Sequence, residues 1–305
     1  VLTGQTEAFT ITGGASADSI TGGAGNDIIT GGAGNDIITG GAGLDNLEGG
    51  SGNDTFNIDA AYDTVTDLGG GSGTDNDIVV VTNVAILNAT DMIGFTATSG
   101  TSNAGTATFN LKAGGVRTLD LSAATGSGSF ILKGNSGDDS ITGTAGADTI
   151  NAGAGADIIL IGTAGHGNSD TIDGGDDADV LQLSTGAHTF ADNNRLLNVE
   201  TVKTHSSGSE VTLTNQTEAF TIIGGAGADI ITGGAQIDTI TGNGGVDTIA
   251  GGAGNDIITA GAGADIITVD AGTDTVLDLG GAGGDESDVV VIESGATLAA
   301  TGIAG

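Results

Sequence analysis

A nine-residue repeat constrains the fold of this chain more than any other feature of its sequence. Residues 22–39 read GGAGNDIIT twice without a gap. Five such units occupy residues 13–57, and five more occupy residues 224–268. A looser set of five occupies residues 134–182, with four extra residues, 161–164, before its fourth unit. A short fixed period predicts a stack of similar units, each of which buries its apolar side only against its neighbours.

Two positions of the nonapeptide never vary in type. The eighth position is always apolar, as Ile20, Ile29, Leu47 and Phe56 illustrate. The sixth position is aspartate in all fifteen units, namely Asp18, Asp27, Asp36, Asp45, Asp54, Asp139, Asp148, Asp157, Asp170, Asp179, Asp229, Asp238, Asp247, Asp256 and Asp265. A physical requirement acts on these two positions, because the others tolerate substitution.

Each nonapeptide divides into a turn and a short strand. The first six residues, such as GGAGND, carry glycines that permit positive φ and close backbone approach. The following tripeptide, such as IIT, points its middle side chain inward. Stacked in parallel at about 4.8 Å, such strands form two small sheets across a thin apolar core. Two units complete one coil, so the sequence predicts an all-β fold, a parallel β-roll in which units n and n+2 lie above one another.

The charge balance indicates what holds the turns together. The chain has 39 acidic residues against 5 lysines and arginines, and all of its basic residues and histidines lie between positions 112 and 205. Stacked sixth-position carboxylates would repel each other unless cations bind them, and calcium prefers six to eight hard oxygen donors. The absence of cysteine excludes disulfides and thiolate metal sites. A net charge of −34 excludes nucleic acid as a partner.

The pattern GGxGxDxUx resembles the calcium-binding repeat of the RTX family, whose fold is the parallel β-roll. The resemblance implies that calcium is held by the fifteen sixth-position aspartates together with backbone carbonyls of the turns. Among the turn residues it points to Gly23, Gly25, Gly32, Gly34, Gly252 and Gly254. Some turns depart from the pattern: Ser16 and Gln236 replace the fourth glycine, and Thr144 replaces the second.

The stacking predicts which carboxylates share an ion. Asp18 pairs with Asp36, Asp36 with Asp54, and Asp27 with Asp45, which gives about three ions per five-unit block. The third block repeats this scheme with Asp229, Asp247 and Asp265 on one edge and Asp238 and Asp256 on the other.

Residues 63–81 resemble the strands that commonly close RTX rolls, where further aspartates bind the terminal ion. The candidates are Asp63, Asp67, Asp77, Asp274, Asp278 and Asp288. The alternative interpretation is a polar strand face beside a glycine- and aspartate-rich loop. Residues 58–133 and 183–223 carry no nonapeptides, but segments 107–111, 116–121, 129–132, 198–204 and 210–214 have the composition of further strands. No segment predicts a helix.

A second period is superimposed on the first. Residues 3–11, TGQTEAFTI, match residues 214–222, TNQTEAFTI, and the alignment continues without a gap at an offset of 211 residues. We therefore expect three domains: a β-roll block with closing strands at 1–94, linking strands with an irregular block at 95–211, and a second copy of the first at 212–305. This organisation is typical of a window on a longer tandem array, with any targeting signal outside it. No apolar run approaches the length of a transmembrane helix.

These features predict the function class. The histidines lack the HExxH spacing of RTX-bearing metalloproteases, and the carboxylates are too regular for acid–base catalysis, so we expect no enzyme. Outward isoleucines such as Ile28 and Ile37 favour packing against another subunit over ice binding by threonine rows.

We expect an elongated rod that serves as a calcium-dependent extracellular structural protein, exported by a type I system to the bacterial cell surface. It would self-assemble as a surface layer, sheath or filament. Its partners are then copies of itself, with cell-surface polysaccharide a further candidate. The alternatives are the extender region of an RTX adhesin and the calcium-binding tail of an exported enzyme.

Overall fold

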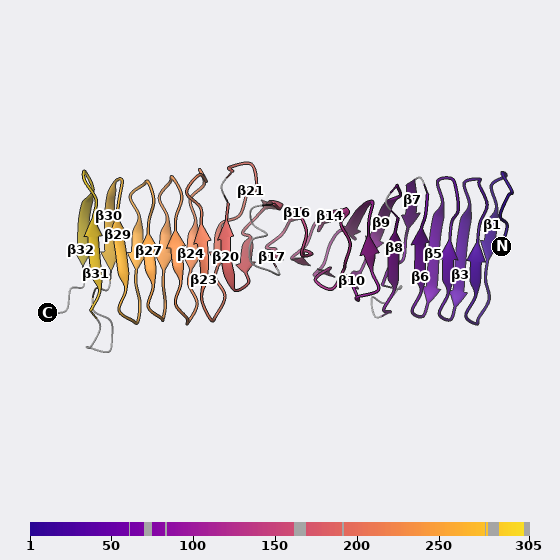
Figure 1. Ribbon diagram of the computed structural model, residues 1–305, viewed down its shortest axis with the longest axis horizontal. Helices are drawn as coiled ribbons and strands as arrows, with labels where there is room; N and C mark the ends of the chain where they lie inside the picture. The colour runs from indigo at the N-terminus through magenta and orange to yellow at the C-terminus, as the bar shows by residue number, and fades with distance from the viewer. Residues whose placement is uncertain are drawn as a thin grey trace. The chain divides into compact units, whose positions relative to one another are not determined.

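The computed structural model is built from β-strands alone within the residues it describes, which are 1–60, 62–69, 75–82, 84–161, 169–190, 192–277, 279 and 287–301. The chain divides into two compact units, Val1–Asp157 and Ile158–Gly305. Figure 1 shows the strands of each unit as successive parallel rungs. None of the described residues forms a helix of the length and apolarity that a membrane crossing requires.

The unit Val1–Asp157 contains three parallel sheets. The first follows the order β1 (Thr10–Thr12), β3 (Ile28–Ala33), β5 (Asn46–Ser51), β7 (Tyr62–Val65), β9 (Ile86–Met92), β12 (Thr106–Leu111), β14 (Ser129–Lys133) and β16 (Asp148–Ala154). The second contains β2 (Ser19–Thr21), β4 (Ile37–Thr39), β6 (Thr55–Ile58), β8 (Ile78–Val81) and β11 (Ser102–Asn103). The third contains β10 (Gly94–Thr96), β13 (Thr118–Asp120) and β15 (Ser140–Thr142).

The unit Ile158–Gly305 repeats this architecture. One sheet follows the order β17 (Ile158–Ile161), β19 (Val180–Leu183), β22 (Thr201–Lys203), β24 (Thr221–Ile223), β26 (Thr239–Thr241), β28 (Ile257–Thr259), β30 (Thr273–Leu277) and β32 (Thr297–Thr301). The opposite sheet contains β20 (Gly186–Thr189), β23 (Ser209–Thr212), β25 (Ile230–Thr232), β27 (Thr248–Ala250), β29 (Ile266–Val269) and β31 (Val289–Ile292). Two further strands, β18 (Thr171–Asp176) and β21 (Leu196–Leu197), pair with each other.

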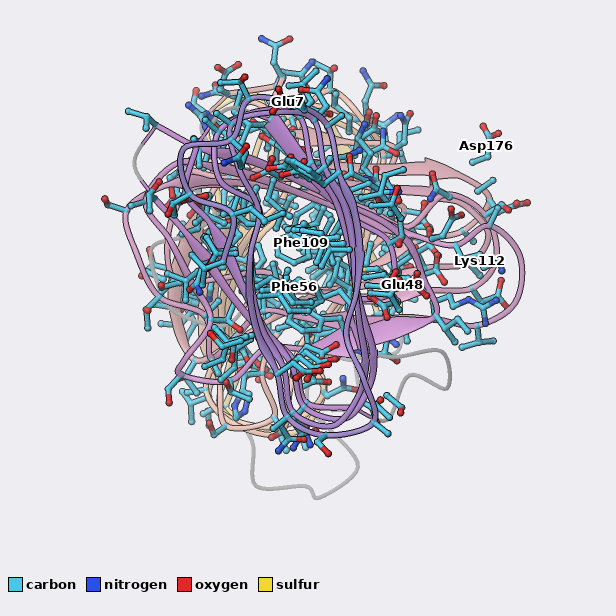
Figure 2. The ribbon with its side chains drawn as sticks, turned by 90° about the vertical axis from the view of Figure 1, so that its right-hand side faces the viewer. Glu7, Glu48, Phe56, Phe109, Lys112 and Asp176 are labelled. Carbon is cyan, nitrogen blue, oxygen red and sulfur yellow. The ribbon has the colours of Figure 1, made fainter. Side chains whose placement is uncertain are left out.

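The register of the strands confirms the parallel β-roll. Within a sheet, residue i lies beside residue i+18, as Ile20 does beside Ile38 and Ile38 beside Phe56. Two nonapeptides therefore complete one coil. The eighth-position side chains form the core, and Ile29, Ile38, Leu47 and Phe56 are fully buried. Figure 2 shows Phe56 and Phe109 inside the ring of strands.

The segments without nonapeptides continue the same stack. Strands β12, β13, β14, β22 and β23 form where the composition predicts them. Strands β7 and β8 do not end the roll, because β9 pairs with β7 and β11 pairs with β8. Of the extra residues 161–164, Ile161 ends β17, and the other three lie outside the described residues, as does His166.

Candidate metal sites along the stacked turns

The sixth-position aspartates stack in columns along the turn edges. The backbone N–H of Asp18 donates a hydrogen bond to Oδ1 of Asp36 at 2.7 Å, and the N–H of Asp36 donates to Oδ1 of Asp54 at 2.7 Å. On the other edge, the N–H of Asp27 donates to Oδ1 of Asp45 at 2.8 Å. Each carboxylate is therefore held by the backbone one coil earlier, and its second oxygen, Oδ2, is left for another partner.

The columns extend past the last nonapeptide predicted from the sequence. Asp45 donates its N–H to Asp63 at 3.1 Å, and Asp54 donates to Asp77 at 2.8 Å. The counterparts 211 residues later do the same, from Asp256 to Asp274 at 3.0 Å and from Asp265 to Asp288 at 3.0 Å. The prediction that residues 58–133 carry no nonapeptide was wrong at its start, since residues 58–66 and 269–277 keep the register with Asp63 and Asp274 at position six.

The other aspartates that the sequence proposed for the closing strands do not join the columns in the same way. Asp67 accepts hydrogen bonds from the N–H groups of Gly49 at 2.9 Å and Gly50 at 2.7 Å, so it binds the turn from outside the column. Asp278 lies outside the described residues. Both terminal blocks thus bring together five stacked carboxylate pairs where the sequence predicted three.

The second carboxylate oxygen exists in two states. In the first nonapeptide turn on each edge of the terminal blocks, Oδ2 accepts the N–H of its own second-position glycine. This bond joins Gly14 to Asp18, Gly23 to Asp27, Gly225 to Asp229 and Gly234 to Asp238 at 2.7–2.8 Å. In later turns, Oδ2 is buried and accepts no hydrogen bond, as in Asp36, Asp45, Asp54, Asp63, Asp139, Asp247, Asp256 and Asp274.

The two states correspond to two turn conformations. The second-position Gly32 and Gly252 have φ of 114° and 99°, a region that favours glycine, whereas Gly23 is not in that region. The fourth position follows the same division, since Gly34 and Gly254 have positive φ and Gly25 does not. A later turn therefore directs its second-position N–H away from its own carboxylate.

Glycine is also required because the turns approach closely. A Cβ on the first-position Gly31 would overlap Oδ2 of Asp36, and a Cβ on Gly32 would overlap the carbonyl oxygen of Gly14 one coil earlier. The same holds for Gly50 over Gly32. The turns thus leave an open cradle lined by a carboxylate oxygen and backbone carbonyl oxygens, which a Cβ at Gly31, Gly32 or Gly50 would fill.

The middle block shows a stacked carboxylate pair of the same kind and one local exception. The N–H of Asp139 donates to Oδ1 of Asp157 at 2.7 Å, and Asp170 and Asp179 are both buried. At Asp148, the backbone N–H of Thr144 donates at 2.7 Å and its hydroxyl donates at 3.0 Å. The carboxylates of Asp18, Asp148 and Asp238, whose turns carry Ser16, Thr144 and Gln236 in place of a glycine, are bonded by their own turn. Asp139 and Asp247 keep an open Oδ2 although Asn135 and Asn243 replace the second glycine of their turns.

Burial makes the stacked carboxylates costly in their ionised form. It raises the pKa of Asp63 and of Asp139 to about 7, and those of Asp77, Asp247 and Asp256 to about 6. The charge of neighbouring carboxylates adds to the effect of burial, and the backbone hydrogen bonds oppose it. A bound divalent cation would remove this cost, because orphaned carboxylate and carbonyl oxygens are the donor set that calcium prefers.

One group of ligand atoms includes a residue that sequence reasoning missed. Carboxylate oxygens of Asp256, Asp270 and Asp274 lie within 4.8 Å of one another. Asp270 also accepts the N–H of Gly252 at 2.9 Å, and its counterpart Asp59 accepts that of Gly41 at 3.3 Å. Both residues occupy the second position of a unit that lacks the first and second glycines, and the 211-residue offset that pairs them was the available signal.

The comparison with known families decides between calcium and other cations. A model of the RTX calcium-binding nonapeptide repeat matches residues 10–38, 21–56, 30–65, 131–163, 164–187, 221–240 and 241–276, which together cover more than half of the chain. The chain belongs to the RTX calcium-binding repeat family. RTX repeats bind calcium and RTX proteins are typically exported, which fits an extracellular location. No curated protein matches the chain.

Proposed function

We propose that this RTX protein is a calcium-dependent structural protein of the bacterial cell surface that assembles with copies of itself. The proposal has two parts, a calcium-built body and a surface for assembly. Both follow from where the chain places its charge. The turns collect buried carboxylates along the edges, and the flat sheet faces between them carry other side chains.

The body depends on calcium through the unpartnered Oδ2 atoms. We assign one ion to each stacked carboxylate pair, which gives five in the first block and five in the third. Asp36, for example, is 1% exposed, holds the backbone of Asp18 through Oδ1, and presents Oδ2 to the cradle. When bound, calcium supplies the positive charge that no basic side chain supplies near these turns.

The observation that carries the assembly is an uncharged face in a strongly acidic chain. On β25, β27 and β29, the outward residues are Ile230, Thr232, Thr248, Ala250, Ile266 and Thr268. Ile230 is 47% exposed and Ile266 is 41% exposed. Two copies of a chain with net charge −34 repel wherever their edges meet, so contact between faces without carboxylates is the favourable arrangement.

The oligomeric state in calcium tests this function. We expect the purified chain to form regular oligomers in millimolar calcium and to dissociate in chelator, by light scattering and electron microscopy. Ile230→Asp combined with Ile266→Asp should abolish assembly while leaving the calcium-dependent circular dichroism unchanged. Val116→Asp, at a 73% exposed position outside strands β25, β27 and β29, serves as the control and should assemble normally.

A wild-type chain that stays monomeric at high concentration in calcium would contradict self-assembly. That outcome would favour the extender region of an adhesin, which needs a folded monomeric body and a ligand-binding domain elsewhere. The same proposal includes three further parts: binding to cell-surface polysaccharide, export by a type I system, and domain boundaries at residues 94 and 211. The oligomeric state does not test these parts, and each needs an experiment of its own.

A further inference from the structure

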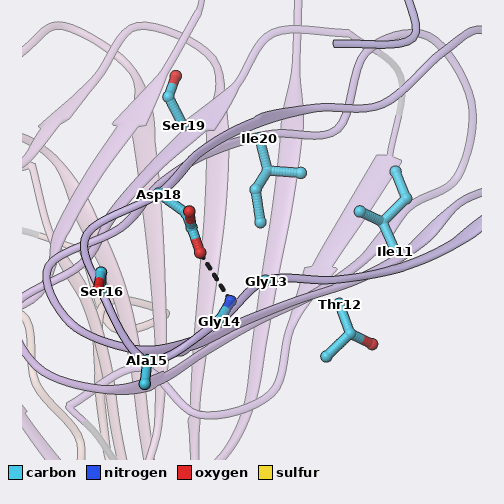
Figure 3. Close-up of a pocket in the computed structure, with 9 residues that line it drawn as sticks. All are labelled: Ile11, Thr12, Gly13, Gly14, Ala15, Ser16, Asp18, Ser19 and Ile20. Atoms are coloured by element: carbon cyan, nitrogen blue, oxygen red, sulfur yellow. Dashed lines mark hydrogen bonds between the residues drawn. The ribbon is translucent and has the colours of Figure 1, made fainter.

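The N-terminal end of the unit Val1–Asp157 presents an uncovered face of the roll. Strands β1 and β2 stand at the ends of their sheets, and among the described strands each pairs with a single neighbour, β3 and β4 respectively. Between them lies a concave pocket of about 470 Å³, lined by residues that include Ile11, Asp18 and Ile20 (Figure 3). The N–H of Leu2 donates to the carbonyl oxygen of Thr21 on β2 at 3.0 Å, and no described strand pairs with the outer side of β1 or β2. Two edge strands beside a hollow lined by Ile11 and Ile20 are suited to accept another coil.

The second copy of the same sequence shows what covers this face. Strands β24 and β25 are the counterparts of β1 and β2 at the 211-residue offset, and they pair on their N-terminal side with β22 and β23. The side chain of Val202 lies in register with Ile222, and that of Val211 with Ile231. All four side chains are essentially fully buried. The coil that precedes the second copy therefore completes its core.

A matching pair of glutamines reports the same contact. Gln216 is fully buried, and its Nε2 donates hydrogen bonds to the carbonyl oxygens of Phe190 at 2.9 Å and Asp192 at 3.1 Å, both in the preceding coil. Its counterpart Gln5 is exposed. The two glutamines lie in the nearly identical sequences TGQTEAFTI and TNQTEAFTI, so Gln5 has the side chain for this contact but not the coil.

The calcium column begins with a bond from that coil as well. The N–H of Ser209 on β23 donates to Oδ1 of Asp229 at 2.7 Å, and Asp229 is 1% exposed. Its counterpart Asp18 is only partly buried. In the second copy, the preceding coil thus holds the carboxylate of Asp229 in place. In the first copy, the carboxylate of Asp18 has no such contact among the described residues and stays partly accessible.

We propose that the face formed by β1 and β2 binds a coil with the sequence of residues 181–211 from another copy of the 211-residue module. The occupant pairs backbone to backbone with both edge strands, places two valines against Ile11 and Ile20, and takes the hydrogen bonds of Gln5. Successive modules then share one uninterrupted stack without a linker. This end-to-end contact is independent of the sheet face proposed above for assembly.

A graft tests the proposal directly. Residues 181–211 are added immediately before Val1, which reproduces the order of residues 181–212. Hydrogen exchange in calcium is measured at the amides of β1 and β2. We expect exchange to slow by about tenfold or more, equivalent to about 1.4 kcal/mol, towards the rates of β24 and β25. The matched control is the same graft carrying Val202→Asp and Val211→Asp, which should give no protection.

Two further measurements keep the test decisive. Gln5→Ala should weaken the protection in the grafted chain and leave the chain without a graft unchanged, whereas Gln216→Ala should weaken β24 in both. Should the graft misfold, the free peptide 181–211 is titrated onto the wild-type chain, against the peptide with both aspartates. Protection absent with both graft and peptide overturns the proposal. Equal protection by the aspartate versions, or protection of β1 by a second unmodified chain, also overturns it.

Discussion

The substitution Asp256→Asn should have opposite effects with and without calcium. Asp256 is fully buried, and its Oδ1 accepts the N–H of Asp238 at 2.9 Å. Its Oδ2 accepts no hydrogen bond, and its own N–H holds Asp274. Asparagine keeps the Oδ1 acceptor and the shape but replaces the free oxygen with an amide. The backbone contacts therefore survive, and only the charge and one ligand are lost.

The magnitude in calcium follows from mass action. At about ten times the dissociation constant, each ion contributes about 1.4 kcal/mol to the free energy of unfolding. Asp256 belongs to two stacked pairs, with Asp238 and with Asp274. Losing both ions costs about 3 kcal/mol, which lowers Tm by about 6–12 °C for a unit of this size.

In chelator the sign reverses. Burial, with added repulsion from Asp238 and Asp274, raises the pKa of Asp256 to about 6 from an ordinary value of 3.8. Near pH 8 the native state must hold this carboxylate ionised, at a cost on the order of 1–3 kcal/mol. Asparagine removes that cost, so the variant should be more stable than the wild type when calcium is absent.

Thermal unfolding in millimolar calcium, followed by circular dichroism, measures the first effect. The residual strand signal in excess chelator near pH 8, where the wild type should be largely unfolded, measures the second. Glu210→Gln is the matched control, because it removes the same charge from an outward position of β23, and it should change the Tm in calcium by no more than about one or two degrees and leave the residual signal in chelator unchanged. A lower Tm in calcium together with a lower residual signal in chelator would refute the reasoning, because Asp256 would then be a structural hydrogen-bonding residue rather than an ion ligand.

Three further predictions follow from the turns. In chelator, the free energy of unfolding should be greatest near pH 4 and fall as pH rises through about 6–7. The reason is that the raised pKa values of Asp63, Asp139, Asp247 and Asp256 let the folded state bind more protons than the unfolded state in this range. Urea titrations over a series of pH values check this, and a free energy of unfolding that rises towards pH 8 contradicts it. Gly50→Ala should lower the free energy of unfolding in calcium by about 2 kcal/mol or more, because it adds a Cβ at φ 98° against the carbonyl oxygen of Gly32. Gly4→Ala, at φ 87° with open space around it, should lower it by only about 1 kcal/mol. Equal losses of Tm for the two variants would argue against the close approach of the turns. Thr144→Gly removes the hydroxyl that donates to Asp148 and permits the positive φ seen at Gly32, so it should raise the bound calcium by about one ion per chain in equilibrium dialysis; an unchanged stoichiometry would mean that the side chain of Thr144 does not block the site.

The sequence predicted most of this architecture because its period is rigid. An invariant aspartate and an invariant apolar residue in every nine positions leave one way to stack, and Asp18, Asp36 and Asp54 lie in one column as predicted. The unit at 58–66 was missed because recognition relied on glycine. Ile58, Asp59 and Ala61 replace the turn glycines there, while Asp63 and Val65 keep the two positions that matter for the column and the core.

The state of each turn could not be read from its own sequence. Residues 22–30 and 31–39 are identical, yet Gly23 donates its N–H to Asp27 while Gly32 adopts positive φ and leaves Asp36 open. The difference lies in what precedes each turn on its edge. The later turn stacks on a nonapeptide turn, with the N–H of Ala33 bonded to Gly14, whereas the earlier turn stacks on the segment at Gln5. Tertiary context selects between two conformations that the residues alone permit.

The central claim is that calcium builds the roll, and a calcium titration near pH 8 tests it most directly. Far-ultraviolet circular dichroism of the whole chain should show little strand signal in excess chelator, because buried carboxylates and ordered glycines oppose folding. The signal should rise cooperatively between about 0.1 and several millimolar calcium, and chelator should reverse it. A full strand signal in excess chelator would contradict the claim, because the fold would then stand without calcium and the ions would only decorate it.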